Sequence, residues 1–393
     1  MNLSSLAVRD PRYPSHNPPH QIPLVAASSF VFDSIEEGMA IFGGEQEGHV
    51  YGRFGNPTID AAANKIAALE GFGLEEQPVG LFCSSGMAAI ATVFLGVCEP
   101  GDVVLTQADL YGGTTGLLQQ LGKRNVGMET VDLRDDDAVG KALAANSRIR
   151  VVYVETPSNP TLRVTDLKKL AAAAHAHGAL LVADNTFATP LVQRPLSFGA
   201  DIVVHSTTKF LNGHGTGIAG AIVCKDPALM TEKIVPVYRL YGGNGNPWDA
   251  WLVLNGLKTL PLRMERHSEN ARRVADFLAD HSGVLRVNYP GLPGHPDAAT
   301  IKAQMSLHGG MLSFELAGGT PAGMDVMNRI NFCTLTPTLG DVDTLVLHPA
   351  TMSHRGVDPA VRAAHGISDG LIRLSVGVEA VEDIIADLKQ AIG

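Results

Sequence analysis

Short apolar runs that alternate with helix-like stretches limit the fold of this chain more than any other feature. Such runs occur at residues 79–82, 103–106, 150–154, 179–183, 202–204 and 218–223, and residues 167–177 are typical of the helical segments between them. Alternating strand-like and helix-like segments indicate βαβ units and a mainly parallel sheet. The sequence therefore predicts an α/β fold over its first two thirds.

The chain is expected to divide into three parts. Residues 1–58 are rich in Pro, Gly and Ser and show little helical periodicity, which predicts an extended arm that wraps another surface. Residues 59–255 hold the alternating segments. Residues 256–393 open with a long predicted helix at 256–279 and add strands at 310–316 and 371–376 and a closing helix near 381–392. These elements predict a smaller α+β domain.

Composition excludes several classes of function. The 393-residue chain carries a formal net charge of −10, which argues against a nucleic-acid partner and against an anionic membrane surface. No apolar run approaches the ~20 residues that span a bilayer, and the N-terminus lacks the pattern of a signal peptide. The four cysteines are widely spaced, so we expect buried thiols in a reducing cytoplasm rather than disulfides or a zinc site.

Two polar clusters directly follow neighbouring apolar runs. Asp184 comes after residues 179–183, and Ser206, Thr208 and Lys209 come after residues 202–204. In open α/β sheets ligands bind outside the carboxyl ends of the strands. An acid at one such end and a hydroxyl-flanked lysine at the next suit pyridoxal 5′-phosphate (PLP): the lysine forms the Schiff base, the aspartate pairs with the ring nitrogen, and hydroxyls bind phosphate. Taken singly, Asp184 fits a helix cap and Lys209 a solvated loop equally well.

Two further stretches are weaker signals for the same site. Residues 83–87 (CSSGM) join a predicted strand to a helix, where free backbone N–H groups can bind an anion. The simpler reading is an N-cap serine on a core helix. Tyr111, which opens the turn at residues 111–114, could stack on an aromatic ring and move protons, although Tyr-Gly-Gly is an ordinary turn.

Two motifs resemble other sites without fitting them. Residues 215–220 match the spelling G-x-G-x-x-G of a dinucleotide site, but that motif must follow a strand and open a helix, whereas here a strand-like run follows. His175 and His177 are two residues apart on a predicted helix and so point to different faces. Neither a dinucleotide site nor a metal site is expected.

Taken together, the motifs resemble those of the Cys/Met-metabolism family of PLP-dependent enzymes, which act in trans-sulfuration. The matching stretches are residues 51–58 (YGRFGNPT), 84–87 (SSGM), 110–114 (LYGGT), 155–160 (ETPSNP), 184–186 (DNT), 205–209 (HSTTK), 348–354 (HPATMSH) and 373–377 (RLSVG). They follow family order from about residue 20 to the C-terminus, and as a set they are highly specific.

The resemblance implies a fold-type-I PLP-dependent transferase (aminotransferase-like) fold and a homotetramer built from two catalytic dimers. In such an assembly Tyr51 and Arg53 reach the phosphate of the neighbouring subunit. Within one subunit the implied phosphate ligands are Gly86, Met87, Ser206 and Thr208. The resemblance also implies that Tyr111 stacks on the ring, Asp184 pairs with its nitrogen and Asn159 lies near its oxygen. Arg373 is the implied clamp for the substrate carboxylate, with Asn159 and Thr338 beside it.

The resemblance does not single out one reaction. Gly113 stands where methionine γ-lyases usually carry cysteine, and Gly52 stands where serine is usual. Residues 309–316 and 340–345 look closest to the lyases (methionine and cystathionine γ-lyase), whereas residues 214–216 look closer to O-acetylhomoserine sulfhydrylase. The favoured expectation is γ-elimination on a methionine- or cystathionine-type amino acid, with Lys209 as base and Tyr111 as general acid. The alternatives are γ-replacement on O-acetyl- or O-succinylhomoserine, an aminotransferase, and a non-catalytic cofactor-binding protein.

Overall fold

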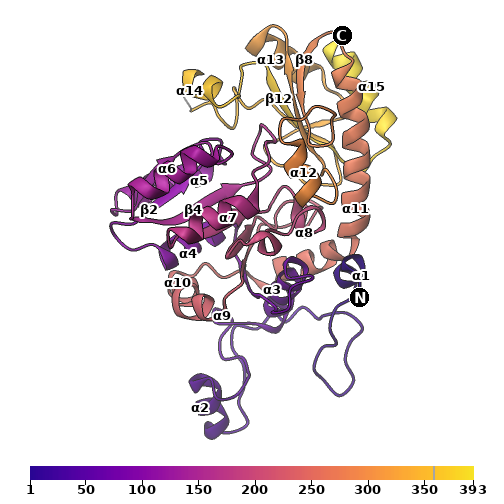
Figure 1. Cartoon of the computed structure of the whole chain (residues 1–393). Coiled ribbons are helices and arrows are strands. Elements are labelled where there is room, and N and C mark those ends of the chain that lie inside the picture. The colour runs from indigo at the N-terminus through magenta and orange to yellow at the C-terminus, as the bar shows by residue number, and fades with distance from the viewer. Residues whose placement is uncertain (357–358) are drawn as a thin grey trace.

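The computed structural model describes residues 1–356 and 359–393, and its main feature is a seven-stranded sheet (Figure 1). The strand order is β1-β7-β6-β5-β4-β2-β3. Only β7 runs antiparallel to its neighbours β1 and β6, so the predicted mainly parallel sheet is confirmed. The strands are β1 (Val79–Cys83), β2 (Val103–Thr106), β3 (Gly127–Thr130), β4 (Ile149–Glu155), β5 (Leu180–Asp184), β6 (Ile202–His205) and β7 (Gly220–Cys224).

Both faces of this sheet are buried, which explains why its strands are apolar throughout. Along β4, Val151 and Tyr153 pack on the face covered by α4, while Val152 and Val154 pack on the face covered by α3 and α7. The covering helices are α3 (Pro57–Glu70), α4 (Gly86–Val97), α5 (Gly112–Gly122), α6 (Asp136–Ala145) and α7 (Leu167–Ala176). These helices cover the faces of the sheet but not the carboxyl ends of its parallel strands, where loops and residues of other segments gather.

A second sheet and its helices form the C-terminal part. The strand order is β10-β11-β12-β9-β8, from β8 (Val284–Asn288), β9 (Met311–Leu316), β10 (Thr334–Leu335), β11 (Leu345–Leu347) and β12 (Leu371–Ser375). Its core lies against α11 (Pro247–Ala279), α13 (Gly319–Arg329) and α15 (Val381–Ile392). The long helix begins at Pro247 rather than at residue 256, so the expected boundary after residue 255 falls inside α11.

The N-terminal segment is only partly the extended arm that was expected. Its first turn of helix, α1 (Leu3–Val8), is capped by Asn2 and buries Ala7, and Asp10 then forms ion pairs with Lys65 and Lys258. Prolines keep residues 11–34 free of helix. Beyond them α2 (Ile35–Gly43) lies well away from both sheets, at the lower end of Figure 1.

The remaining described segments complete the chain. They are α8 (Thr189–Val192), the 3₁₀ turn Pro195–Phe198, α9 (Pro227–Leu229), the π-helical turn Met230–Ile234, α10 (Val235–Tyr241), α12 (Ala298–Gln304) and α14 (Pro359–Ala364). All four cysteines are buried and unbonded, as predicted. Within residues 1–356 and 359–393 no helix is long and apolar enough to cross a membrane.

Candidate active site

The carboxyl ends of β4, β5 and β6 border a cavity of about 310 Å³ that also receives residues of the second sheet. Most of the expected site residues line it: Gly86, Met87, Tyr111, Asn159, Asp184, Ser206, Thr208, Lys209 and Arg373. The helices and strands that carry these side chains are far apart in sequence. The fold therefore gathers residues of six separate sequence segments around one cavity.

Lys209 stands in the turn that follows β6. Its Nζ donates a hydrogen bond to Thr338 Oγ1 at 2.8 Å, which brings the expected substrate residue Thr338 to the amine. Burial, together with the nearby Arg373 guanidinium, lowers the pKa of Lys209 to about 8. The neutral, nucleophilic amine is therefore a minor form at pH 7 and makes up about half of the population at pH 8.

Asp184 ends β5 and is held by two donors. The backbone N–H of Thr186 donates to Oδ1 at 2.9 Å and the Tyr153 hydroxyl donates to Oδ2 at 3.2 Å. Burial raises the pKa of this carboxyl, while the hydrogen bonds from Thr186 and the charge of His205 oppose the rise. A cationic ring nitrogen placed on Asp184 would supply the partner that a buried carboxylate requires.

The N-terminus of α4 borders the cavity and has the backbone geometry that suits an anion. Ser85 caps the helix by accepting the N–H of Ala88 at 3.0 Å, which leaves the N–H groups of Gly86 and Met87 without an acceptor in the described residues. A Cβ at Gly86 would stand 2.7 Å from Ser206 Cβ, so glycine is needed for the two segments to meet. The Thr208 hydroxyl already exchanges hydrogen bonds with the Ala219 backbone at 3.1 Å. Phosphate would share that hydroxyl.

Arg373 reaches the cavity from β12 in the second sheet. It is 5% exposed; Nη1 donates to Asn159 Oδ1 at 3.3 Å and Nη2 donates to the Thr338 carbonyl at 3.0 Å. Burial lowers its pKa to about 10. No carboxylate within the described residues forms an ion pair with Arg373, so this buried cation is suited to a substrate carboxylate.

Glu155 also lines the cavity, although no role is predicted for it from the sequence. Both of its carboxylate oxygens accept the backbone N–H of Tyr111, at 3.0 and 2.9 Å, and thus fix the start of α5. Burial, followed by the charge of Asp184, raises the pKa of Glu155 well above its ordinary range. The signal was present: Glu155 follows an apolar run in the same way as Asp184. Other lining residues without an assigned role are Ser85, Ile90, Pro157, Thr186, Phe187, Ile218, Pro337 and Leu339.

Tyr51 and Arg53 do not line this cavity. Tyr51 is 44% exposed. Arg53, in the segment just before α3, donates a hydrogen bond to the carbonyl of Arg239 in α10 at 2.5 Å. Of the two rejected motifs, residues 215–219 form a loop ahead of β7, and His175 pairs with Asp201 at 2.9 Å. The described part of the chain contains no cluster of three or more His, Cys, Asp or Glu that would hold a metal ion.

Comparisons with known proteins agree with this geometry. The profile of the family described as "Cys/Met metabolism PLP-dependent enzyme" matches residues 5–393. An L-methionine gamma-lyase of Porphyromonas gingivalis is 44% identical over 94% of this chain and 92% of its own length. A cystathionine beta-lyase of Coxiella burnetii is 43% identical over 89% of each chain.

A solved structure of similar fold gives the same result. Cystathionine gamma synthase of Xanthomonas oryzae pv. oryzae, in complex with aminoacrylate and cysteine, superposes with a TM-score of 0.92. It is 39% identical, over 100% of this chain and 98% of that one. The lysine and aspartate at adjacent strand ends, the helix N-terminus beside them and these similarities lead to one conclusion: the chain belongs to the Cys/Met-metabolism family of PLP-dependent enzymes, with their fold-type-I architecture.

Proposed function

We propose that this enzyme catalyses γ-elimination on a sulfur-containing amino acid of the L-methionine or L-cystathionine type, releasing 2-oxobutyrate, ammonia and a thiol. One observation carries the proposal: a buried amine and a buried guanidinium without a carboxylate partner in the described chain face the same cavity. An α-amino acid has the two groups that this pair would recognise. Arg373 would take its carboxylate, which orients Cα toward Lys209.

The residues of the cavity fit PLP. Lys209 would hold it covalently, Asp184 would bind its ring nitrogen, and Gly86, Met87, Ser206 and Thr208 would bind its phosphate. Tyr111 would lie on the ring and Asn159 near its oxygen. When bound, the cofactor supplies an electron sink for the pair left at Cα after a proton is removed.

The protein residues then move protons. Lys209, when not bound to the cofactor, would remove the Cα proton, since its amine is mostly neutral above pH about 8. It would pass that proton on to the bound cofactor before it took the Cβ proton. Loss of the Cβ proton drives cleavage of the Cγ–S bond, and Tyr111 would give the leaving sulfur its proton. Water finally releases ammonia and 2-oxobutyrate. Glu155 would keep Tyr111 in place through the backbone of Tyr111.

The active unit is proposed to be a dimer within a homotetramer, with residues 1–58 as the arm, 59–255 as the cofactor domain and 256–393 as the C-terminal domain. Large apolar side chains of the arm are exposed, namely Val31, Ile35, Met39 and Phe42. Ile218, which lines the cavity, is 66% exposed as well. Exposed apolar surface of this kind is typical of a subunit interface. The unbonded thiols favour the cytoplasm as the location.

A second candidate is γ-replacement on O-acetyl- or O-succinylhomoserine, which needs the same residues. The 39% sequence identity to a cystathionine gamma synthase supports this second candidate reaction. Elimination and replacement share their first steps and differ in the second reactant: water completes the elimination, whereas a thiol completes the replacement. An aminotransferase remains a third and weaker candidate, because residues 51–53 and the turn before Lys209 resemble trans-sulfuration enzymes instead.

The deciding experiment measures 2-oxobutyrate released from L-methionine by the PLP-loaded protein without added thiol. We expect steady release. The Lys209→Ala variant should lose at least about a thousand-fold in rate, since it lacks both the covalent anchor and the base.

Other products would assign other reactions. Negligible release, together with thiol-dependent consumption of O-acetylhomoserine, would establish replacement. Pyruvate from L-cystathionine would instead mean cleavage at Cβ. Amino-group transfer to an added keto acid would identify an aminotransferase, and full activity of Lys209→Ala would remove the assignment of the lysine.

A further inference from the structure

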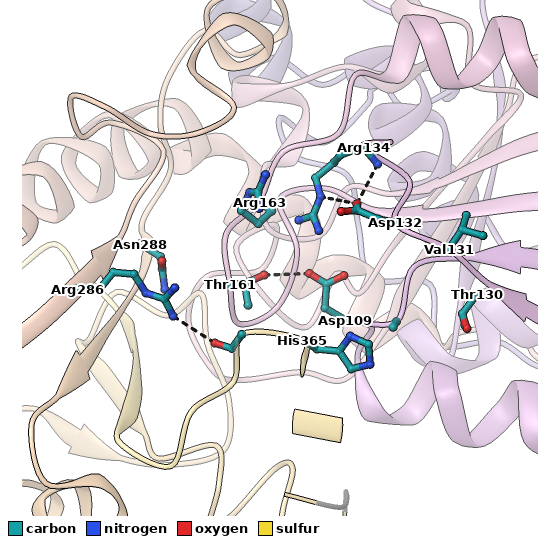
Figure 2. A pocket seen from close by; sticks show the side chains of 12 residues that line it. Asp109, Thr130, Val131, Asp132, Arg134, Thr161, Arg163, Arg286, Asn288 and His365 are labelled. Carbon is teal, nitrogen blue, oxygen red and sulfur yellow. Dashed lines mark hydrogen bonds and ion pairs between the residues drawn. The ribbon is translucent and has the colours of Figure 1, made fainter. Parts of the chain in front are cut away.

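A second cavity, of about 460 Å³, lies beside the active site at the carboxyl ends of β2, β3 and β4 (Figure 2). Thr130, the last residue of β3, and Asp109, in the loop after β2, line one wall. Arg286 and Asn288 of β8 line the opposite wall. Ligands of α/β proteins bind at this edge of the sheet, and here both sheets contribute side chains.

One end of the cavity offers unused cationic donors. Arg134 Nε donates to Asp132 at 2.7 Å, and Arg163 donates through Nε and Nη2 to Asp297, both at 2.7 Å. Both terminal nitrogens of Arg134 and the Nη1 of Arg163 have no acceptor in the described part of the chain. In Figure 2 the two guanidinium groups lie on the same side of the cavity. They are placed to bind a carboxylate between them.

Facing these donors is a carboxylate, that of Asp109, which forms no ion pair within the described residues. Asp109 is 8% exposed, and its Oδ2 accepts a hydrogen bond from Thr161 Oγ1 at 2.9 Å. No lysine, arginine or histidine nitrogen of the described residues lies within ion-pair distance of it. A carboxylate this deeply buried is stabilised by a cationic partner, and the cavity provides room for one.

We propose that this cavity is a second binding site, for a small free α-amino acid, whose ammonium group binds Asp109 and whose carboxylate binds Arg134 and Arg163. The cavity is lined by both acidic and basic side chains, which suit a ligand that carries a positive and a negative group. A plain anion would meet Asp109 and Asp132, and a plain cation would meet three arginines, whereas a zwitterion satisfies both. The volume lies within the range of small-molecule sites.

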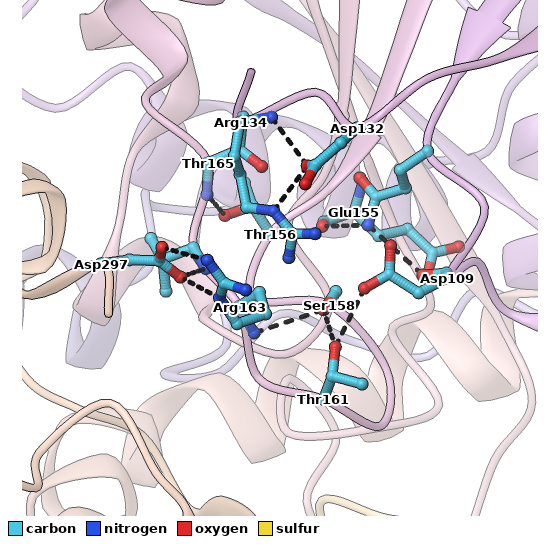
Figure 3. A network of polar contacts seen from close by, with 12 residues as sticks. Asp109, Asp132, Arg134, Glu155, Thr156, Ser158, Thr161, Arg163, Thr165 and Asp297 are labelled. Carbon is cyan, nitrogen blue, oxygen red and sulfur yellow. Dashed lines mark hydrogen bonds and ion pairs between the residues drawn. The ribbon is translucent and has the colours of Figure 1, made fainter. Parts of the chain in front are cut away.

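One loop contributes to both cavities, with Asn159 lining the active site and Thr161 lining the second cavity. Thr161, which binds Asp109, also hydrogen-bonds Ser158 at 2.6 Å (Figure 3). Asn159 lies between Ser158 and Thr161 in the sequence. Asn159 in turn accepts from Arg373, the proposed clamp of the active site. An ammonium on Asp109 would share this carboxylate with the Thr161 hydroxyl, so binding there can act on the loop that carries Asn159. The second site is therefore regulatory; this effect, but not the binding itself, rests on the proposed function.

The test is a calorimetric titration of the PLP-loaded enzyme with glycine while the cofactor absorption is recorded. Binding in the active site changes the absorption, because the amine meets the cofactor there; binding in the second cavity releases or absorbs heat without that change. In the wild type we expect a silent binding event, meaning heat of binding without a change in cofactor absorption. This event should be lost in Asp109→Asn, which keeps the shape of the side chain, and in Arg134→Ala.

Matched controls are Asp137→Asn and Arg124→Ala, which remove the same charges from exposed positions outside the cavity and should keep the event. Absence of a silent event in the wild type, or its persistence in Asp109→Asn and Arg134→Ala, would overturn the assignment. Neither result depends on turnover. The binding of glycine in the second cavity can be measured even if the enzyme releases no 2-oxobutyrate. Likewise, release of 2-oxobutyrate can be measured even if glycine does not bind there.

Discussion

Lys209 is a residue whose surroundings set its reactivity. Burial moves its pKa from 10.5 to about 8, and the protonated amine cannot attack the cofactor aldehyde. We therefore expect the rate at which the apo-protein takes up PLP covalently to rise about tenfold per pH unit below pH 8 and to level off above it. Stopped-flow absorption after mixing with PLP measures this rate.

The control for this pH profile is Nα-acetyl-lysine, whose amine keeps an ordinary pKa and should still accelerate well above pH 8. A profile of the protein that parallels the free amine would show that the buried environment does not tune Lys209.

A second residue-scale prediction concerns Glu70 and His205. Both side chains are fully buried, and His205 Nε2 lies 2.7 Å from Glu70 Oε1, which also accepts the Asn185 amide at 2.7 Å. Removing one partner strands a buried polar group, so Glu70→Ala should lower the free energy of unfolding by about 3–5 kcal/mol. Urea unfolding measures it, and Glu75→Ala at an exposed position is the control. A loss equal to that of Glu75→Ala would contradict the role of the pair.

The sequence predicts chemistry best where a polar residue follows an apolar run. Asp184 and Lys209 were predicted in this way, and both line one cavity in the structure. Glu155 obeys the same rule but had no role, because its partner is a backbone N–H that no sequence pattern encodes. Thr338 and Arg373 entered only through family resemblance, since nothing local marks a residue of a distant sheet as facing Lys209.

At the scale of elements, the junction of β1 and α4 is the most constrained. An alanine Cβ at position 86 would lie 2.7 Å from Ser206 Cβ and 3.0 Å from its Cα, so the turn before Lys209 would have to move. Overpacking of this kind costs about 1–3 kcal/mol, and it would act where phosphate is proposed to bind. Gly86→Ala should weaken PLP binding about 10- to 100-fold in a fluorescence titration.

The matched change is Gly116→Ala inside α5, where no atom lies within 4 Å of the added Cβ. This variant should bind PLP as the wild type does. Equal affinity of both variants would show that the N-terminus of α4 does not cradle phosphate.

Elements were predicted where their residues are buried on both faces. The strand at residues 103–106 has the predicted bounds, and every one of its residues is buried. The edge strand β3 was missed, because its residues alternate between partly buried and exposed and form no apolar run. Helix α1 was missed because prolines dominate the segment that follows it, and its burial depends on α11, which lies more than 200 residues away.

At the scale of the molecule, the long helix α11 connects the region of the seven-stranded sheet with the region of the second sheet. It runs beside α1 at one end and the second sheet at the other (Figure 1). Arg263, buried within α11, donates to the carbonyls of Phe210 and Gly256, both at 2.7 Å. The turn just after Lys209 is thereby tied to this helix. No periodicity in the sequence predicts such a tie, because it depends on how distant elements pack.

The last prediction concerns the arm, whose Tyr51 and Arg53 lie outside the cavity of their own chain. If they complete the neighbouring subunit's site, Tyr51→Phe and Lys209→Ala damage different chains of each shared site. Mixed subunits would then contain one intact site, with Lys209 from one chain and Tyr51 from the other. We expect two nearly inactive variants, unfolded and refolded together, to regain about a quarter of wild-type activity if they assort at random in two-fold dimers. Refolding each variant alone is the control. Activity of the mixture no higher than that of the separate variants would mean that each chain builds its site alone, and Tyr51 would then need another role.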